Sequence, residues 1–240
     1  MALIKTKAIV LGSLKYGDTS LIVKCFTLEE GLKTYLLKGI LSSKKGKIKA
    51  AYFQPLTQIN IEANHNKKGN LNSIKEVHVV SPYKNIYTNI YKQTIVLFLS
   101  EILSNTIQEE ESNQSLFSFL ETAFIWLDTN EKTSNFHLLF LLNLTKFLGF
   151  YPETTNNHRK YFNLIEGNFS ESTVEKEVVY GDNLVQFKKL LGTNFDGIES
   201  IKFNKIERQK VLQIIIRYFE LHLEGFRKPK SLKVLETVFN

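Results

Sequence analysis

The 240-residue chain is poor in the residues that build disulfide frameworks and thiolate metal sites. It has a single cysteine, Cys25, so it can form neither an intrachain disulfide nor a CxxC pair of metal ligands. It also lacks an apolar run long enough to cross a bilayer, and no hydrophobic signal segment follows its first charged residues. These absences favour a cytoplasmic protein that does not bind a membrane.

The sequence also lacks the common signatures of catalysis. It contains no P-loop, no Rossmann glycine fingerprint, and neither the HExxH nor the GxSxG motif. Its five histidines are scattered, and no two of them are spaced to share a metal on one helix face. We therefore expect no enzymatic activity, no catalytic residue, no bound metal and no cofactor.

Positive charge is abundant but unevenly distributed. Residues 1–80 carry 13 Lys/Arg against 5 Asp/Glu, whereas residues 81–240 carry 18 against 19. Clustered Lys and Arg side chains displace several condensed counterions from a phosphate backbone at once. The N-terminal third is therefore expected to bind a polyanion.

The residue pattern predicts an α+β protein of two domains. Up to residue 80, short β-like runs alternate with turns at 12–19, 29–31 and 64–70. The five runs cover 4–11, 20–27, 33–39, 56–62 and 73–80. Five strands in so short a segment predict a small OB-fold β-barrel.

Helical periodicity begins after Ser81 and Pro82, which gives domains of 1–80 and 81–240. We expect helices over 84–108, 115–127 and 135–148, and a long one opened by a capping box of Asn204 and Glu207. Between them, about 152–183, the chain is polar and weakly patterned. That stretch predicts an irregular insertion with a β-hairpin around 178–180.

One local segment, residues 38–49, has a composition suited to binding phosphate. It combines lysines with two glycines and two serines, which lets phosphate approach the backbone closely. Nearby Tyr35, Tyr52 and Phe53 could stack on unpaired bases or could belong to the barrel core, and the sequence leaves both readings open. The expected DNA contacts are Lys38, Lys44, Lys45, Lys47 and Lys49, with Lys5, Lys7, Lys15 and Lys33 as flanking contacts.

The order of several short motifs resembles the RecO family of bacterial recombination mediators. The motifs are GDTSLIV at 17–23, LKG at 37–39, FQPL at 53–56, FLGFYP at 147–152 and KSLKVL at 230–235. The resemblance implies an OB-fold domain followed by a helical domain. It further implies a nucleoid-associated protein that binds single- and double-stranded DNA and anneals complementary strands. With its partner RecR, such a protein helps to load RecA onto strands coated by single-strand-binding protein.

Two further expectations follow from the resemblance. Many family members hold a zinc ion with four cysteines after the equivalent of Pro152, but none occurs here, so we expect a hairpin held by packing alone. The family's helical domain binds the acidic, apolar C-terminal tail of single-strand-binding protein, for which Arg217, Phe226 and Arg227 are the candidates. Two alternatives stay open: an adaptor between RecR and single-strand-binding protein with little DNA binding, and an RNA-binding OB-fold protein.

Overall fold

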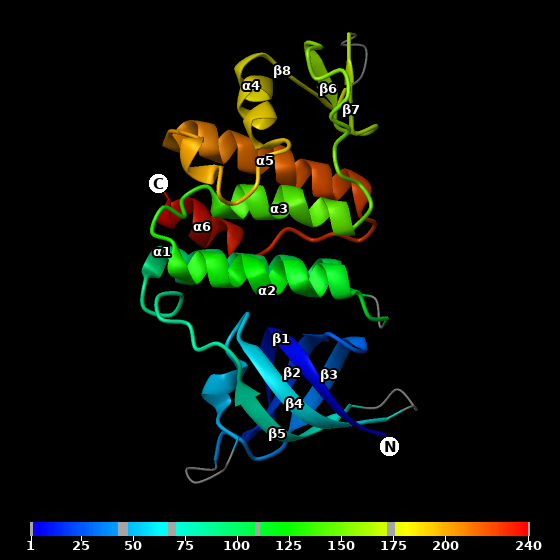
Figure 1. Cartoon of the computed structure of the whole chain (residues 1–240), viewed down its shortest axis with the longest axis vertical. Coiled ribbons are helices and arrows are strands. Elements are labelled where there is room, and N and C mark those ends of the chain that lie inside the picture. Colours follow the sequence, from blue (N-terminus) through cyan, green and yellow to red (C-terminus); the bar gives the residue numbers. More distant parts are fainter. Residues whose placement is uncertain (1, 43–47, 67–70, 109–110, 172–175, 240) are drawn as a thin grey trace. The chain divides into compact units, whose positions relative to one another are not determined.

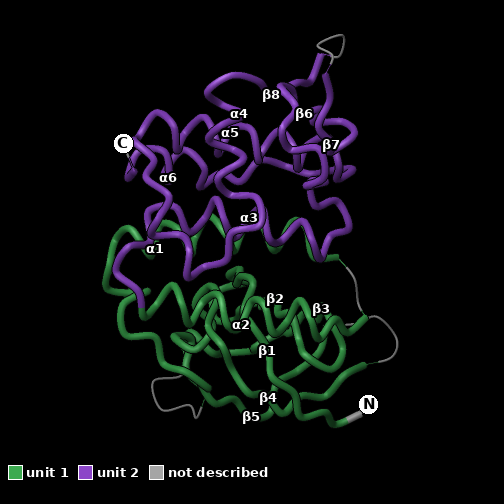
Figure 2. The backbone as a smooth tube through the Cα atoms, turned by 45° about the horizontal axis from the view of Figure 1, so that its top comes forward, with its two compact units in different colours: residues 1–129 green, residues 130–240 purple. Residues whose placement is uncertain are grey.

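The computed structural model describes residues 2–42, 48–66, 71–108, 111–171 and 176–239. It divides into two compact units, residues 1–129 and residues 130–240 (Figure 2). Each unit has its own sheet and helices. The strands end near the expected boundary at residue 80, but the first compact unit extends beyond it and includes two helices.

Unit 1 begins with a five-stranded antiparallel sheet (Figure 1). The strands are β1 (Ala2–Tyr16), β2 (Ser20–Thr27), β3 (Gly31–Leu37), β4 (Gln58–His65) and β5 (Ser73–Val79). Their order in the sheet is β3-β2-β1-β4-β5. The first strand is longer than predicted, because residues 12–16 stay paired with β2 and only residues 17–19 form the turn.

The two edge strands of this sheet meet and close it. A parallel bridge joins Tyr35 of β3 to Asn72, just before β5. The Asn72 amide donates to the carbonyl of Thr34 at 3.0 Å, and the Leu36 amide donates to the carbonyl of Asn72 at 2.9 Å. A short 3-10 helix (Ala50–Phe53) lies between β3 and β4. This arrangement is the OB-fold that the strand count predicted.

Alternation along the strands explains the core. Side chains of one face of each strand point inward, so Val23 and Cys25 of β2 meet Ile59 and Ile61 of β4 in the barrel interior. Tyr35 of β3 joins them. Burial raises the pKa of the Cys25 thiol above its usual range, which makes it an unreactive core residue.

Two helices complete unit 1: α1 (Ile90–Thr106) and α2 (Gln114–Thr129). Lys24 of β2 donates to the carbonyl of Ser104 near the end of α1. Gln58 of β4 donates to the carbonyl of Glu121 in α2 at 2.9 Å. These contacts tie both helices to the barrel.

A buried carboxylate holds the connection between the barrel and α1. Asp128 of α2 accepts hydrogen bonds from the backbone amides of Lys84, Asn85 and Ile86 at 2.8–2.9 Å. Burial alone would raise the pKa of Asp128, but these three amides and the nearby Lys92 ammonium outweigh it and hold the pKa below its usual value. The linker is therefore fixed by an ionised group.

Unit 2 combines helices with a second, small sheet. Its helices are α3 (Phe136–Phe147), α4 (Gly181–Leu190), α5 (Lys205–His222) and α6 (Leu232–Val238), and a 3-10 turn covers Ile198–Ser200. The predicted capping box of Asn204 and Glu207 at the start of α5 is confirmed. The sequence pattern did not predict α4, whereas α6 overlaps the KSLKVL motif at 230–235, which resembles the end of the family's last helices.

The segment 152–183, expected to be irregular, holds a three-stranded antiparallel sheet. Its strands are β6 (Tyr161–Asn163), β7 (Asn168–Ser170) and β8 (Val178–Tyr180), in the order β7-β6-β8. The hairpin is formed by β6 and β7, and the residues expected to form it, 178–180, pair with β6 as a third strand.

Candidate nucleic-acid interface

A groove opens on the barrel beside the point where its edges meet. Past the bridge at Asn72, the end of β3 and the start of β5 line its two sides, and its volume is about 690 Å³. The apolar lining is Leu36, Leu37, Ile40, Ile48, Leu71 and Ile74. Lys38 and Lys75 stand on opposite sides, both exposed. Among the described residues, neither lysine has a carboxylate within ion-pair distance. The groove therefore combines an apolar floor with two cations.

Lys75 was missed by the sequence reading. It lies 37 positions after Lys38, on a different predicted strand, so no local pattern links the two. Closure of the barrel at Tyr35 and Asn72 brings their strands together. Only the prediction that the barrel closes could have indicated that Lys75 lies near Lys38.

A partly exposed apolar row leads across the sheet to the groove, with Leu14 exposed and Ile22 and Leu36 half-buried. Leu14 of β1 pairs with Ile22 of β2, and Ile22 pairs with Leu36 of β3, which lines the groove. Leu14 is 68% exposed, and Tyr16 on the same face of β1 is 55% exposed. Exposed aromatic and aliphatic side chains of this kind offer a surface for unpaired bases.

Two of the expected flanking lysines are already paired with carboxylates. The Lys5 ammonium lies 3.2 Å from Glu62 of β4, and the Lys7 ammonium lies 2.8 Å from Glu121 of α2. A cleft of about 480 Å³ beside them is also lined by Glu29, Glu62 and Glu76. Local carboxylates offset the lysine charge here, so the net positive charge on this side of the barrel is smaller than its lysines alone would give.

The other expected lysines are dispersed. Lys15 is exposed near the tip of the β1–β2 hairpin, and Lys49 is exposed just before the 3-10 helix. Lys33 on β3 is half-buried. Lys44, Lys45 and Lys47, the centre of the predicted phosphate loop, lie outside the described residues.

The structure decides between the two readings of the nearby aromatic residues. Tyr35 and Phe53 are buried in the barrel core, and Tyr52 packs against that core. Tyr35 and Phe53 therefore cannot stack on bases. Tyr16, which the sequence reading passed over, is the exposed ring in this region.

The candidate partner-binding residues of unit 2 differ in their burial and in the contacts of their side chains. Arg217 of α5 contacts both carboxylate oxygens of Glu177, at 2.6 and 3.1 Å, and these hydrogen bonds raise its pKa further. Phe226 is half-buried, with its ring 5.5 Å from that of Phe219. Arg227 is exposed. Arg217 is thus occupied by an internal ion pair.

In segment 152–183, the residues that the structure describes do not fit a zinc ion. No cysteine lies there, and no group of three or more His, Cys, Asp or Glu within the described ranges could hold a metal. Aromatic rings fill the interior instead. Phe162 of β6 lies 5.0 Å from Phe169, 5.2 Å from Phe187 and 6.1 Å from Tyr218, measured between ring centroids.

Within the residues that the structure describes, no helix has both the length and the apolar character needed to cross a bilayer.

Comparison with known proteins gives matches over nearly the whole chain. The family model "Recombination protein O N terminal" matches residues 1–83, and "Recombination protein O C terminal" matches residues 87–233. The chain is 49% identical to a DNA repair protein RecO of Christiangramia forsetii and to one of Flavobacterium psychrophilum, over 99% of each chain. It is 37% identical to a DNA repair protein RecO of Bacteroides fragilis, over 98% of this chain and 99% of the relative.

Proposed function

The chain belongs to the RecO family of DNA repair proteins, and from this premise we propose that its barrel binds DNA. In this proposal the protein binds single- and double-stranded DNA and anneals complementary strands. With RecR it helps to load RecA onto strands coated by single-strand-binding protein. The mechanism needs no catalytic residue, because complementary strands pair with a favourable free energy once the repulsion between their phosphates is screened.

The observation that carries the proposal is the lysine-flanked groove on a barrel with excess positive charge. Residues 1–80 have a net charge of +8, from 13 Lys/Arg and 5 Asp/Glu. Lys38 and Lys75 can neutralise phosphates on the two sides of the groove, while its aliphatic floor and Tyr16 offer contacts to bases. Neutralised phosphate lets a second strand approach the first.

The test is a salt titration of single-stranded DNA binding by the full chain, together with annealing of complementary oligonucleotides without ATP. The double substitution Lys38→Ala/Lys75→Ala should flatten the dependence of log affinity on log salt by about 1.4–1.8, at about 0.7–0.9 for each lost phosphate contact. Lys5→Ala/Lys7→Ala removes the same charge from the side where both lysines are paired. This control should leave the slope unchanged.

The outcomes separate the candidate functions. Equal slopes for the two double variants would remove the groove from the DNA interface. If the parent protein shows neither salt-dependent binding nor annealing, the role of an adaptor between RecR and single-strand-binding protein replaces DNA binding. A preference for RNA in direct competition would favour the RNA-binding alternative.

For the tail of single-strand-binding protein, we propose unit 2 as the docking site, with Phe226 and Arg227 as its central contacts. An acidic, apolar peptide needs an accessible ring beside a cation, and these two residues adjoin in sequence. Arg217 of α5 is the third candidate contact. The substitutions Phe226→Ala, Arg227→Ala and Arg217→Ala should each weaken binding of a fluorescent acidic tail peptide, measured by anisotropy. Unchanged binding in all three variants would exclude this docking site.

A further inference from the structure

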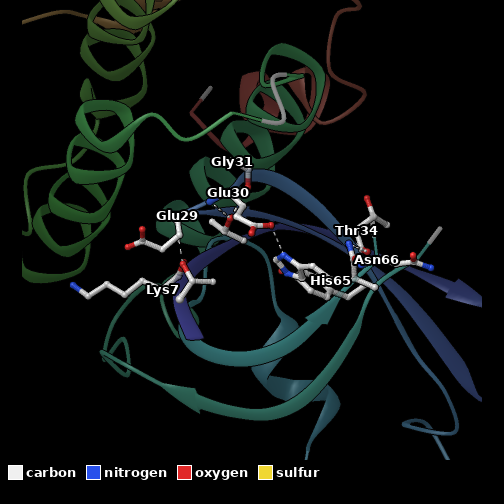
Figure 3. A network of polar contacts seen from close by, with 11 residues as sticks. Lys7, Glu29, Glu30, Gly31, Thr34, His65 and Asn66 are labelled. Atoms are coloured by element: carbon white, nitrogen blue, oxygen red, sulfur yellow. Dashed lines mark hydrogen bonds and ion pairs between the residues drawn. The ribbon is translucent and has the colours of Figure 1, made fainter. Parts of the chain in front are cut away.

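Three side chains form a hydrogen-bonded chain within the barrel. Nδ1 of His65, at the end of β4, lies 2.5 Å from Oε2 of Glu30. Nε2 of His65 lies 2.9 Å from the hydroxyl of Tyr35. Figure 3 shows Glu30 reaching the imidazole from the β2–β3 turn. These hydrogen bonds therefore join the β2–β3 turn and β3 to the end of β4, which lies 30 to 35 positions further along the sequence.

The chemistry of the groups fixes the direction of one of these hydrogen bonds. A carboxylate only accepts, so Nδ1 of His65 carries a proton and donates to Glu30. The second hydrogen bond joins Nε2 of His65 to the Tyr35 hydroxyl, which can either donate or accept. Tyr35 and His65 are both buried, so water cannot replace a bond that is lost between them.

A second set of hydrogen bonds connects these three side chains to the groove. The amide of Asn66, next to His65, donates to Oδ1 of Asn72 at 2.9 Å. Nδ2 of Asn72 donates to the carbonyl of Thr34 at 3.1 Å, beside Tyr35. Asn72 lines the groove and bridges β3 to the start of β5. The end of β4 is thus bonded to both sides of the groove.

We propose that Glu30, His65 and Tyr35 are positioning residues that fix the separation between the two sides of the groove, and with it the placement of Lys38 and Lys75. None of the three lines the groove. They act through the backbone of β3 and through Asn72. The link to DNA rests on the proposed function, whereas the positioning is a property of the barrel itself.

The test measures the groove directly. Nitroxide labels are attached to Leu41→Cys, next to the lining residue Ile40, and to Leu71→Cys, which lines the other side of the groove; both leucines are exposed. Cys25 is fully buried and is not labelled. The distance distribution between the labels is recorded by electron paramagnetic resonance in the full chain, with and without Tyr35→Phe. The matched control is Tyr83→Phe, which also removes a tyrosine hydroxyl bond in unit 1, to the carbonyl of Leu56, away from the groove.

Tyr35→Phe should broaden the distribution, and Tyr83→Phe should leave it as narrow as in the parent. Glu30→Ala, which removes the acceptor at the more exposed end of this hydrogen-bond network, should broaden it as well. Equal widths in the parent, Tyr35→Phe and Glu30→Ala would overturn the proposal.

DNA binding supplies a second readout. Tyr35→Phe should lower affinity about two- to tenfold with an unchanged salt slope, because the lysine contacts are displaced rather than removed. An affinity equal to that of Tyr83→Phe would overturn the link between the chain and DNA. If the parent does not bind DNA at any salt concentration, the proposed function fails, and the distance distributions still decide whether the chain positions the groove.

Discussion

The barrel of unit 1 and the three-stranded sheet of unit 2 are both antiparallel, but different side chains hold their shapes. In the barrel, hydrogen bonds with a defined direction hold two regions. His65 lies between Glu30 and Tyr35, near the place where the edge strands meet. Asp128 binds three backbone amides of the linker between β5 and α1. In the small sheet, Phe162 packs among other rings. Directional bonds specify a geometry, whereas ring packing mainly buries area.

This difference suits the proposed roles of the two regions. A groove that must present two lysines at a defined separation benefits from bonds that tolerate little displacement. A sheet that only has to stay folded can rely on burial.

Phe162→Ala should have the largest effect on stability. The ring is fully buried among Phe169, Phe187 and Tyr218. Its loss should lower the free energy of unfolding by about 3–5 kcal/mol, measured by urea denaturation followed by circular dichroism. Phe162→Leu, which keeps much of the buried area, should recover more than half of this loss. A loss below about 1 kcal/mol for the alanine variant would contradict a sheet held by ring packing.

Asp128→Ala should cost about 2–3 kcal/mol at neutral pH, because three amides lose a charged acceptor. The pKa of Asp128 is lowered in the folded state, so its contribution is present above the unfolded carboxyl pKa of about 3.9 and is lost as pH falls through the folded value. The gap between parent and variant should therefore be constant near neutrality and shrink in acid. Asp18→Ala, an exposed control, should show no such gap.

Gly167→Ala, in the turn between β6 and β7, should lower the free energy of unfolding by about 2 kcal/mol. Gly167 has φ +68°, and an added Cβ would lie 2.5 Å from the Tyr218 hydroxyl oxygen. Gly192→Ala is the matched control, because its φ is +73° but its Cβ would meet open space, so about 1 kcal/mol is expected. Adding Tyr218→Phe to Gly167→Ala should restore part of the difference, as measured by thermal unfolding. No restoration would mean that the contact is not the cause.

A metal chelator should have the smallest effect, with no change in Tm. The interior of the small sheet is filled by rings, and its segment has no thiolate. The measurement is a thermal scan with and without EDTA, paired with metal analysis of the purified protein. A lower Tm in EDTA, together with bound zinc, would show that ligands other than cysteine hold a metal there.

The barrel could be predicted from the sequence because its strands alternate. Ile59 and Ile61 are both buried on one face of β4, as the pattern indicated. In the small sheet the sequence predicted β structure only around 178–180, and β6 and β7 were missed because strands of three residues, such as Tyr161–Asn163, are too short to show a period. Its tertiary neighbours, including Phe187 of α4 and Tyr218 of α5, come from distant parts of the chain.

The site was predictable only in its general character. The charge excess of residues 1–80 can be read from the sequence, but the environment of each lysine cannot. Lys7 meets Glu121, which lies 114 positions away, and Lys75 approaches Lys38 only after the barrel closes. Such pairings are set by topology, so composition could identify the region but not its working face.

The contacts of α1 and α2 with the barrel also determine where this protein can be divided. A fragment ending at residue 80 would expose Phe26, whose ring lies 6.0 Å from that of Phe117, and would leave Gln58 without its acceptor on α2. The exposed apolar surface of this fragment would favour aggregation. Failure of the fragment to bind DNA would therefore say nothing about the full protein. The smallest fragment worth expressing is 1–129, and it must keep Asp128, the residue before its last.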